Sequence, residues 1–309
     1  MSCCHPPGPA HGGPGAPFPP AEHAGGGPGV HPIETVDIPA GGFAMGDAFD
    51  EGYRTDGERP VHEVELGAYS IDATTVTNAA FATFVAATGH QTDAERFGGS
   101  AVFHTYATAP GEPVPGTPWW LAVEGASWRH PAGPGSRVDD LADHPVVHVS
   151  HRDAQAYCVW AGRVLPTEAQ WENAARGGLR GARYPWGNEP PTAEAPRCNI
   201  FRGEFPDAPT ARVGTVPVRD FEPNGFGLYQ CAGNVWEWCA DTFSARYYRV
   251  SDRSNPLGPG RGSARVLRGG SHLCHDSYCH RYRVAARSHN TPESTASNIG
   301  FRTVGPAAG

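Results

Sequence analysis

The strongest constraint on the fold is that no long helical period appears after about residue 177. That half of the chain is rich in glycine, asparagine, tryptophan and arginine, and its apolar runs are short, as in "RVLRGGS" and "NIGFRTV". Backbone groups in buried loops must still find hydrogen-bond partners. The sequence therefore predicts a loop-rich structure that buried polar side chains or ions hold together.

The N-terminal half, in contrast, contains regular elements. Short alternating segments bounded by glycine begin at "VDIPAGGFAMG" and predict strands and turns. Three segments predict helices, because each combines a capping residue with an apolar face of helical period. The expected helices follow Thr77 and end at Gly89, follow Ser150 with Asp153 three residues on, and follow Thr167 with Gln170 before a stop at Gly177.

We divide the chain into a tail of residues 1–32, one domain of residues 33–305 and a short tail of residues 306–309. The first tail is dominated by Gly, Pro, Ala and His, a composition that cannot offset its own ordering entropy. The stretch "ATAPGEPVPGTPWW" leads back into patterned sequence, so we interpret it as a surface excursion of the same domain.

Charge and hydropathy exclude several classes of function. No run of about 18 apolar residues exists, and the N-terminus lacks a basic region and a hydrophobic segment. We therefore expect neither a membrane span nor a secretory signal, and a cytoplasmic location. The formal net charge of −8 argues against nucleic acid as a partner. Neither a G-x-S-x-G elbow nor a P-loop is present, which does not favour a hydrolase or a kinase.

Eight cysteines are too few for a disulfide-built scaffold, and their positions are more informative than their number. Cys3 and Cys4 lie in the tail. Cys274 and Cys279 form a close pair in a polar setting, within "SHLCHDSYCHRYR". Four others have apolar or aromatic neighbours and are expected to be small buried side chains: Cys158, Cys198, Cys231 and Cys239.

The C-x4-C pair by itself leaves three interpretations equally open: a disulfide, a metal site or inert thiols. A disulfide is geometrically feasible at this spacing. The spacing is not a standard one for zinc, which would also need two more ligands. His272, His275 and His280 flank the pair and could supply them.

A second group of histidines, His144, His148 and His151 in "HPVVHVSH", could be interpreted as a metal cluster. In a strand, the first two would share one face. The segment leads into the helix that Ser150 caps, so a metal role is not favoured. The H-x3-H-x-E iron pattern is absent from the sequence.

Taken in order, the motifs resemble those of the formylglycine-generating enzymes of the sulfatase-modifying factor family, in their bacterial form. The resemblance covers about residues 33–304 and includes "DHPVVHVSHRDAQAYCVWAGRVLPTEAQWENAARGG", "GNVWEW", "GGSHLCHDSYCHRYR" and "AARSHNTPESTASNIGFR". "GNVWEW" alone indicates only the wider superfamily, whereas the cysteine pair with its flanks is much more specific. The resemblance implies an α+β fold with low regular secondary structure, similar to a C-type lectin.

The resemblance also implies an activity. Members of the family are oxidoreductases that convert the cysteine of a C-x-P-x-R motif in an unfolded sulfatase to formylglycine, with O2, Cu(I) and a thiol reductant. By position, Cys274 and Cys279 would bind copper, a soft ion that prefers sulfur, and Ser271 and Trp236 would line the pocket for oxygen and the client thiol. The implied substrate-binding residues are Ser100, Trp119, Trp120, Tyr278, Arg287 and Asn298.

Two loops match calcium sites of the family, whose ligands are oxygens. The first would use Gln230, the carbonyls of Gly233 and Val235, and the Glu237 carboxylate; the family usually has asparagine where Gln230 stands. The second starts at Asn199 and Ile200, but the chain is shortened there and Thr210 occupies the usual acidic position. For both loops a hydrogen-bonded turn without metal is the alternative.

Two other functions stay open at this point. One is a metal-free thiol and disulfide oxidant of the same fold. The other is a lectin-like module that binds peptides without changing them. The expected partners are the unfolded sulfatase chain, O2 and the thiol reductant, with no nucleic acid and no membrane, and we expect a monomer.

Overall fold

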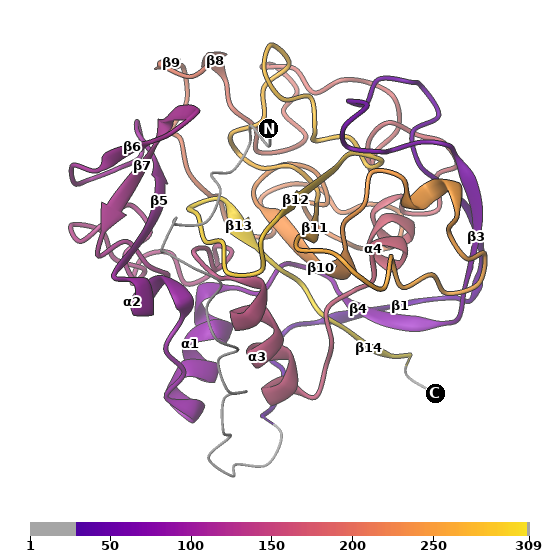
Figure 1. The fold of residues 1–309 in the computed structure, drawn as a ribbon, viewed down its shortest axis with the longest axis horizontal. Coiled ribbons are helices and arrows are strands. Elements are labelled where there is room, and N and C mark those ends of the chain that lie inside the picture. Colours follow the sequence, from indigo (N-terminus) through magenta and orange to yellow (C-terminus); the bar gives the residue numbers. More distant parts are fainter. Residues whose placement is uncertain (1–28, 308–309) are drawn as a thin grey trace.

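The computed structural model describes residues 29–307. Its centre is a four-stranded sheet in the order β12-β11-β10-β13, drawn in orange and yellow in Figure 1. The strands are β10 (Trp236–Thr242), β11 (Arg265–Arg268), β12 (Arg287–Asn290) and β13 (Ile299–Gly300). β10 pairs antiparallel with β11 and parallel with β13. The glycine-rich C-terminal half thus supplies the central sheet.

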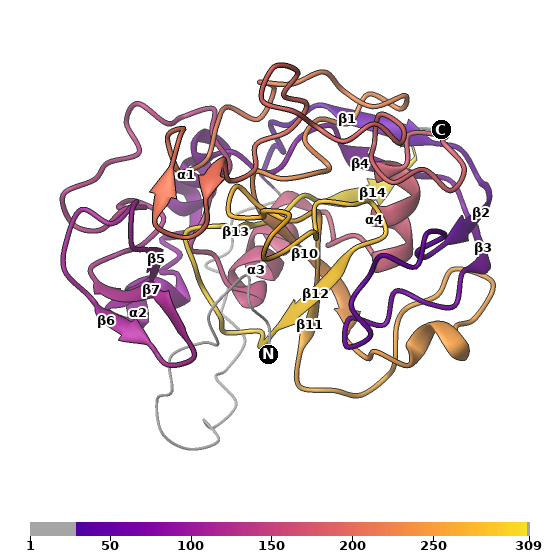
Figure 2. The same cartoon turned by 90° about the horizontal axis from the view of Figure 1, so that it is seen from above.

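A second sheet joins the two ends of the described chain. β4 (Tyr69–Asp72) lies between β1 (Thr35–Ile38) and β14 (Val304–Pro306), in antiparallel pairing with both. A two-stranded sheet and a three-stranded sheet lie at opposite ends of the molecule in Figure 2. At one end, β2 (Gly41–Met45) pairs with β3 (His62–Leu66). At the other, β7 (Thr117–Glu124) pairs with β5 (Gly99–Phe103) and β6 (Glu112–Val114).

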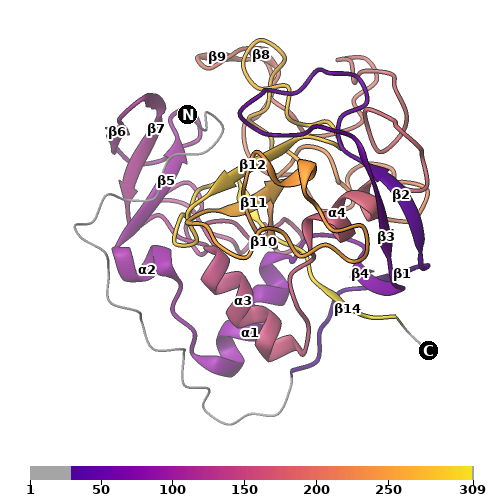
Figure 3. The same cartoon turned by 45° about the vertical axis from the view of Figure 1, so that its right-hand side comes forward.

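The predicted helices are confirmed, and their caps are those expected from the sequence. α1 (Asn78–Thr88) is capped by Thr77 and ends at Gly89, which has a φ of 67°. α3 (His151–Ala161) starts with a capping box of Ser150 and Asp153. α4 (Glu168–Ala175) starts with the box of Thr167 and Gln170 and ends at Arg176, directly before Gly177. Figure 3 shows α1 and α3 below the central sheet.

Short elements complete the described chain. α2 (Asp93–Phe97) was not predicted, although a capping box of Thr92 and Glu95 starts it and Gly98 ends it, because five residues are too few to show a helical period. The others are β8 (Gly203–Glu204), β9 (Ala208–Pro209) and the 3-10 turn η1 (Tyr247–Arg249). This mixture of short strands, few helices and long loops confirms the α+β class with low regular secondary structure. Within residues 29–307, no helix has both the length and the apolar character to cross a membrane.

Buried arginines hold the loops together, as the sequence predicted for buried polar side chains. Arg268, Arg283, Arg287 and Arg302 are among the largest side chains that are fully buried. Each forms an ion pair with a buried glutamate: Arg268 with Glu168 and Glu172, Arg283 with Glu58, Arg287 with Glu168, and Arg302 with Glu237. Removing one partner from such a pair leaves an uncompensated buried charge.

The four cysteines expected in the interior are buried free thiols. Burial raises the pKa of each thiol, to about 12 for Cys198 and Cys231. Since the thiolate is the reactive form, these cysteines are inert side chains of the core. The prediction for Cys3 and Cys4 lies outside the described residues.

Candidate functional site

The loop that follows β11 closes on itself and brings Cys274 and Cys279 together. Gly270, with a φ of 74°, lies so close to Arg281 that an added Cβ would be 2.7 Å from the Arg281 carbonyl oxygen. Only glycine fits a positive φ with such a close approach. Within the loop, the backbone N–H of Cys279 donates to the carbonyl of His275 at 2.6 Å. Gly270 therefore allows the chain before and after the two cysteines to approach closely.

The two sulfur atoms face one another and are not bonded to each other. Their separation is 3.4 Å, far above the length of about 2.05 Å for a disulfide bond. Both side chains are buried at 0% exposure. The backbone N–H of Ser271 points at the Cys274 sulfur at 3.4 Å, and Arg281 Nη1 lies 3.7 Å from the Cys279 sulfur. The sulfur pair thus has N–H donors on both sides.

Three of the predicted site residues lie together beside this loop. Asn298 Nδ2 donates to Ser271 Oγ at 3.0 Å. The backbone N–H of Trp236 donates to the Asn298 carbonyl at 2.8 Å, where β10 meets β13. All three side chains are buried. The sheet therefore fixes Ser271, which is three residues from Cys274, against the rigid end of β13.

An aromatic patch lies around Tyr278, a residue of the cysteine loop. It contains two predicted substrate residues and one residue that the sequence did not suggest. The ring of Tyr278 stacks on the ring of Phe205, with 4.4 Å between the ring centroids, and packs edge to face with the ring of Trp119, with 5.0 Å between the centroids. The rings of Phe205 and Trp119 also pack edge to face, with 5.7 Å between their centroids. Phe205 lies between β8 and β9, far from the other two in the sequence. No sequence signal marked it, because only the fold brings it to the patch.

Trp120 does not belong to this patch. It is 1% exposed and packs edge to face against Phe103 in the core. Successive side chains of a strand point to opposite faces, so β7 turns Trp120 inward while Trp119 stays half-buried. The expectation that both tryptophans form a wall for the peptide does not hold for Trp120, and for Trp119 it stays a prediction.

Arg287 also lies elsewhere than the resemblance implied. Its guanidinium is fully buried, pairs with Glu168 at 2.6 Å and 2.7 Å, and donates to the carbonyls of Asp56 and Gly57. It therefore fastens loops and presents no surface to a substrate. Ser100 lies in a network of its own, in which its Oγ is 2.7 Å from Thr295 and 2.8 Å from His148 Nδ1.

The predicted calcium ligands fit unevenly. Gln230 Oε1 is buried and has no hydrogen-bond partner among residues 29–307, so it is available to a cation. The Glu237 carboxylate, in contrast, accepts two hydrogen bonds from Arg302, at 2.6 Å and 2.8 Å, and one from Trp171 at 2.8 Å. Glu237 is thus a core ion-pair residue, and its predicted role as an open calcium ligand does not fit this structure. Gly233 and Val235 lie in the buried segment directly before β10, the strand that carries Glu237.

The second predicted calcium loop is arranged as a hydrogen-bonded turn. Asn199 Nδ2 donates to the Gly214 carbonyl at 2.9 Å and to Asn234 Oδ1 at 3.1 Å. Ile200 packs against the core, and Thr210 at the usual acidic position is exposed. Across residues 29–307, no group of three or more His, Cys, Asp or Glu side chains could hold a metal ion.

The histidines of "HPVVHVSH" are separate from one another and not on a strand. His144 lies 3.0 Å from Thr215 Oγ1, His148 Nε2 lies 2.9 Å from the Pro131 carbonyl, and His151 Nε2 lies 3.1 Å from the Cys239 carbonyl. Burial lowers all three pKa values, to about 4 for His148 and about 3 for His151. Each of the three histidines thus has its own hydrogen-bond partner, and the prediction against a metal role stays a prediction.

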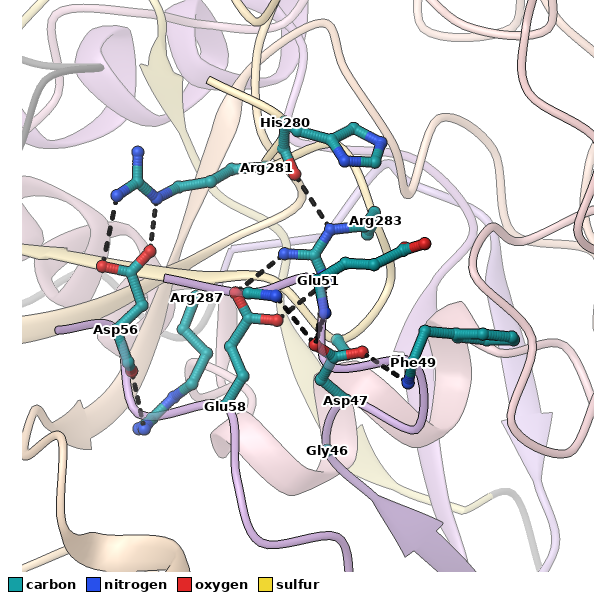
Figure 4. Close-up of polar contacts among 12 residues, drawn as sticks. Gly46, Asp47, Phe49, Glu51, Asp56, Glu58, His280, Arg281, Arg283 and Arg287 are labelled. Atoms are coloured by element: carbon teal, nitrogen blue, oxygen red, sulfur yellow. Dashed lines mark hydrogen bonds and ion pairs between the residues drawn. The ribbon is translucent and has the colours of Figure 1, made fainter. Parts of the chain in front are cut away.

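The segment after Cys279 is clamped by a loop from the other end of the chain. Residues 46–59, between β2 and β3, carry Asp56 and Glu58, and these carboxylates face Arg281 and Arg283 in Figure 4. Arg281 Nε lies 2.5 Å from Asp56 Oδ2, and Arg283 forms two hydrogen bonds with Glu58 at 2.8 Å and 2.9 Å. Two parallel ion pairs therefore anchor the cysteine loop.

Known proteins are similar to this chain in sequence or in fold. Residues 27–307 match the family model described as "Sulfatase-modifying factor enzyme 1-like domain". The chain is 58% identical, over 298 residues, to the formylglycine-generating enzyme of Streptomyces coelicolor, with 93% of this chain and 95% of that protein covered. The formylglycine-generating enzyme of Thermomonospora curvata is 55% identical over 278 residues, covering 86% and 91%.

Among solved structures, PvdO from Pseudomonas aeruginosa is similar to this chain with a TM-score of 0.62 at 24% identity. The similarity covers 89% of this chain and 95% of PvdO. At that identity the similarity establishes the fold alone.

Proposed function

This chain belongs to the sulfatase-modifying factor enzyme 1-like family, and on that premise we propose that it is an oxidoreductase that converts a cysteine of a sulfatase chain to formylglycine. The client cysteine lies in a C-x-P-x-R motif of an unfolded chain. The thiol R–CH2–SH, dioxygen, two electrons and two protons give the aldehyde R–CHO, hydrogen sulfide and water. The β-carbon is oxidised, dioxygen is reduced, and an external thiol reductant supplies the electrons.

Cu(I) is the proposed cofactor, and Cys274 and Cys279 would hold it. Their sulfurs face each other at 3.4 Å without a bond between them, and soft thiolate ligands select Cu(I). A structural zinc ion would need four ligands, whereas no third His, Cys, Asp or Glu joins the pair into a metal-binding group within residues 29–307. When bound, the copper ion supplies a site at which the client thiol and dioxygen can react.

The other residues of the site bind and orient the client. Ser271 Oγ, fixed by the Asn298 amide, is a hydroxyl beside the sulfur pair that can donate to sulfur or oxygen. The patch of Trp119, Phe205 and Tyr278 offers an apolar surface for the proline of the motif. Trp236, fully buried at 0% exposure, would form the inner wall of the site, next to Asn298.

A structural calcium ion is a further part of this proposal. The buried Oε1 of Gln230 without a partner suits a hard cation that binds oxygen. The carbonyls of Gly233 and Val235 would add two further oxygen ligands, without the carboxylate of Glu237, and water would supply the others.

The observation that carries the proposal is the pair of buried sulfurs 3.4 Å apart, not bonded to each other, with N–H donors on both sides. A peptide-binding module would need no such pair. A metal-free oxidant would use the two cysteines as a disulfide, and its turnover would survive removal of copper.

The test incubates the pre-reduced protein with a C-x-P-x-R peptide, Cu(I), dioxygen and a thiol reductant, and follows the peptide by mass spectrometry. We expect aldehyde formation that stops when a Cu(I) chelator is added and in the Cys274→Ser and Cys279→Ser variants. Cys158→Ser is the matched control, because Cys158 is a buried free thiol of α3 outside the site. Full turnover in both serine variants would overturn the proposal.

A further inference from the structure

We propose that Asp56 and Arg281 act as a positioning pair for the copper-binding sulfur of Cys279. The inference rests on the proposed function, because it assigns to two residues a role in the affinity of that site for Cu(I). Neither residue is part of the cysteine pair, and Asp56 comes from the loop between β2 and β3, more than two hundred positions away in the sequence.

The geometry gives Arg281 a bridging position. Its Nε and Nη2 atoms face the two carboxylate oxygens of Asp56, at 2.5 Å and 3.2 Å. This fork arrangement fixes the plane of the guanidinium. Its third nitrogen, Nη1, is thereby directed to the Cys279 sulfur at 3.7 Å. Asp56 thus determines where the N–H donor of Arg281 points.

The surroundings keep this arrangement in place. The side chains of Arg281 and Asp56 are only 4% and 6% exposed. The ring of Tyr53, from the same loop as Asp56, lies 4.2 Å from the guanidinium carbon, within cation–π distance. The Tyr53 hydroxyl donates to the Tyr278 carbonyl at 3.4 Å, next to Cys279. One loop therefore fixes both the arginine and the backbone beside the sulfur.

Charge provides the physical reason for the pair. Two thiolates with one monovalent cation carry a net negative charge in a site that excludes water, and a buried charge without a partner is costly. The guanidinium beside Cys279 supplies positive charge and an N–H donor at that point. Groups that contact the ligands of a metal in this way commonly change its affinity by about 10–100-fold when they are removed.

The structure offers a matched control for this role. Glu58 lies two residues from Asp56 on the same loop and pairs with Arg283, which lies two residues from Arg281 (Figure 4). This second pair is equally buried, but its contacts go to Asp47 and to the His280 carbonyl, not to a cysteine sulfur. Asp56→Asn and Glu58→Gln therefore each remove one buried carboxylate, but only the arginine partner of Asp56 contacts the Cys279 sulfur.

The experiment measures Cu(I) affinity of the full chain, pre-reduced and free of oxygen, by competition with a chromogenic chelator. The ultraviolet charge-transfer band of thiolate-bound Cu(I) provides a second readout. We expect Asp56→Asn and Arg281→Gln to weaken Cu(I) binding by about 10–100-fold. Glu58→Gln is expected to stay within about 2-fold of the original chain, although it lowers the unfolding midpoint to a similar extent.

The outcomes separate this inference from the function on which it rests. If the original chain does not take up Cu(I) through its two cysteines, the proposed function fails. If it takes up Cu(I) and Asp56→Asn binds equally well, or no worse than Glu58→Gln, the positioning role is refuted and the proposed function stands. Arg281→Lys keeps the charge without the fork, so a loss of affinity in this folded variant supports the role of orientation.

Discussion

The ion pair between Arg302 and Glu237 gives the sharpest test of how the loops are held together. Both side chains are buried, at 0% and 1% exposure, and they meet through two hydrogen bonds. Arg302 also donates to the carbonyls of Asp72 and Tyr229. Replacing Arg302 with methionine keeps most of the volume but leaves the Glu237 carboxylate with Trp171 as its remaining partner.

Removing one partner from a buried pair costs about 3–5 kcal/mol. For a chain of this size each kcal/mol corresponds to about 2 °C, so Arg302→Met is expected to lower the melting temperature by about 6–10 °C. Adding Glu237→Gln removes the uncompensated charge. The double variant should therefore be more stable than the sum of the two single losses predicts, with a coupling of at least about 1 kcal/mol.

Equilibrium unfolding in urea, monitored by circular dichroism, measures all four members of this cycle. Losses that add within about 0.5 kcal/mol would refute the ion-pair interpretation. Repeating the cycle with EGTA and with excess calcium tests the alternative. If Glu237 were an open calcium ligand, the cost of Glu237→Gln would appear only with calcium present.

Three further predictions follow from the site and its surroundings. Burial, with the Glu168 carboxylate nearby, raises the pKa of Asp241 to about 7; its stabilising contribution is therefore present below about pH 4 and is lost as pH rises through 7. The stability of Asp241→Asn, measured relative to the original chain, should therefore increase from pH 5 to pH 8. If the difference between the urea midpoints of the two chains is the same at pH 5 and at pH 8, this prediction is contradicted. Trp120→Ala should lower the free energy of unfolding by about 3–5 kcal/mol, because it truncates a core side chain. Trp119→Ala should mainly raise KM for the peptide. The reverse pattern in unfolding and kinetics would show that the inward and outward faces of β7 are misassigned. A calcium concentration one hundred times Kd should stabilise the original chain by about 2.7 kcal/mol and raise its melting temperature. Gln230→Ala should abolish this rise, and a retained rise would exclude Gln230 as a ligand.

Local signals in the sequence proved reliable. The resemblance to the sulfatase-modifying factor family and the fold class are confirmed by the family match and by the shared fold of PvdO. The three predicted helices start at the predicted caps, because a capping side chain bonds to a backbone group only three residues away. The burial of Cys158 and Cys239 likewise followed from their apolar neighbours.

Sequence signals failed where the outcome depends on partners far along the chain. Nothing local distinguishes Glu237 as an ion-pair partner from Glu237 as a calcium ligand, because Arg302 lies 65 positions away. Similarly, neighbouring residues of a strand point to opposite faces, but only packing against Phe103 shows that Trp120 is the inward residue. Phe205 and Asp56 reach the site by chain closure alone.

The sequence by itself determined the helix starts, the buried thiols and the short loop that carries the cysteine pair, because these depend on residues a few positions apart. Only the tertiary structure decided which carboxylate faces which arginine, which tryptophan faces outward and what lies beside each sulfur. Those choices depend on the long-range closure of loops, and the buried charges make each pairing costly to exchange for another.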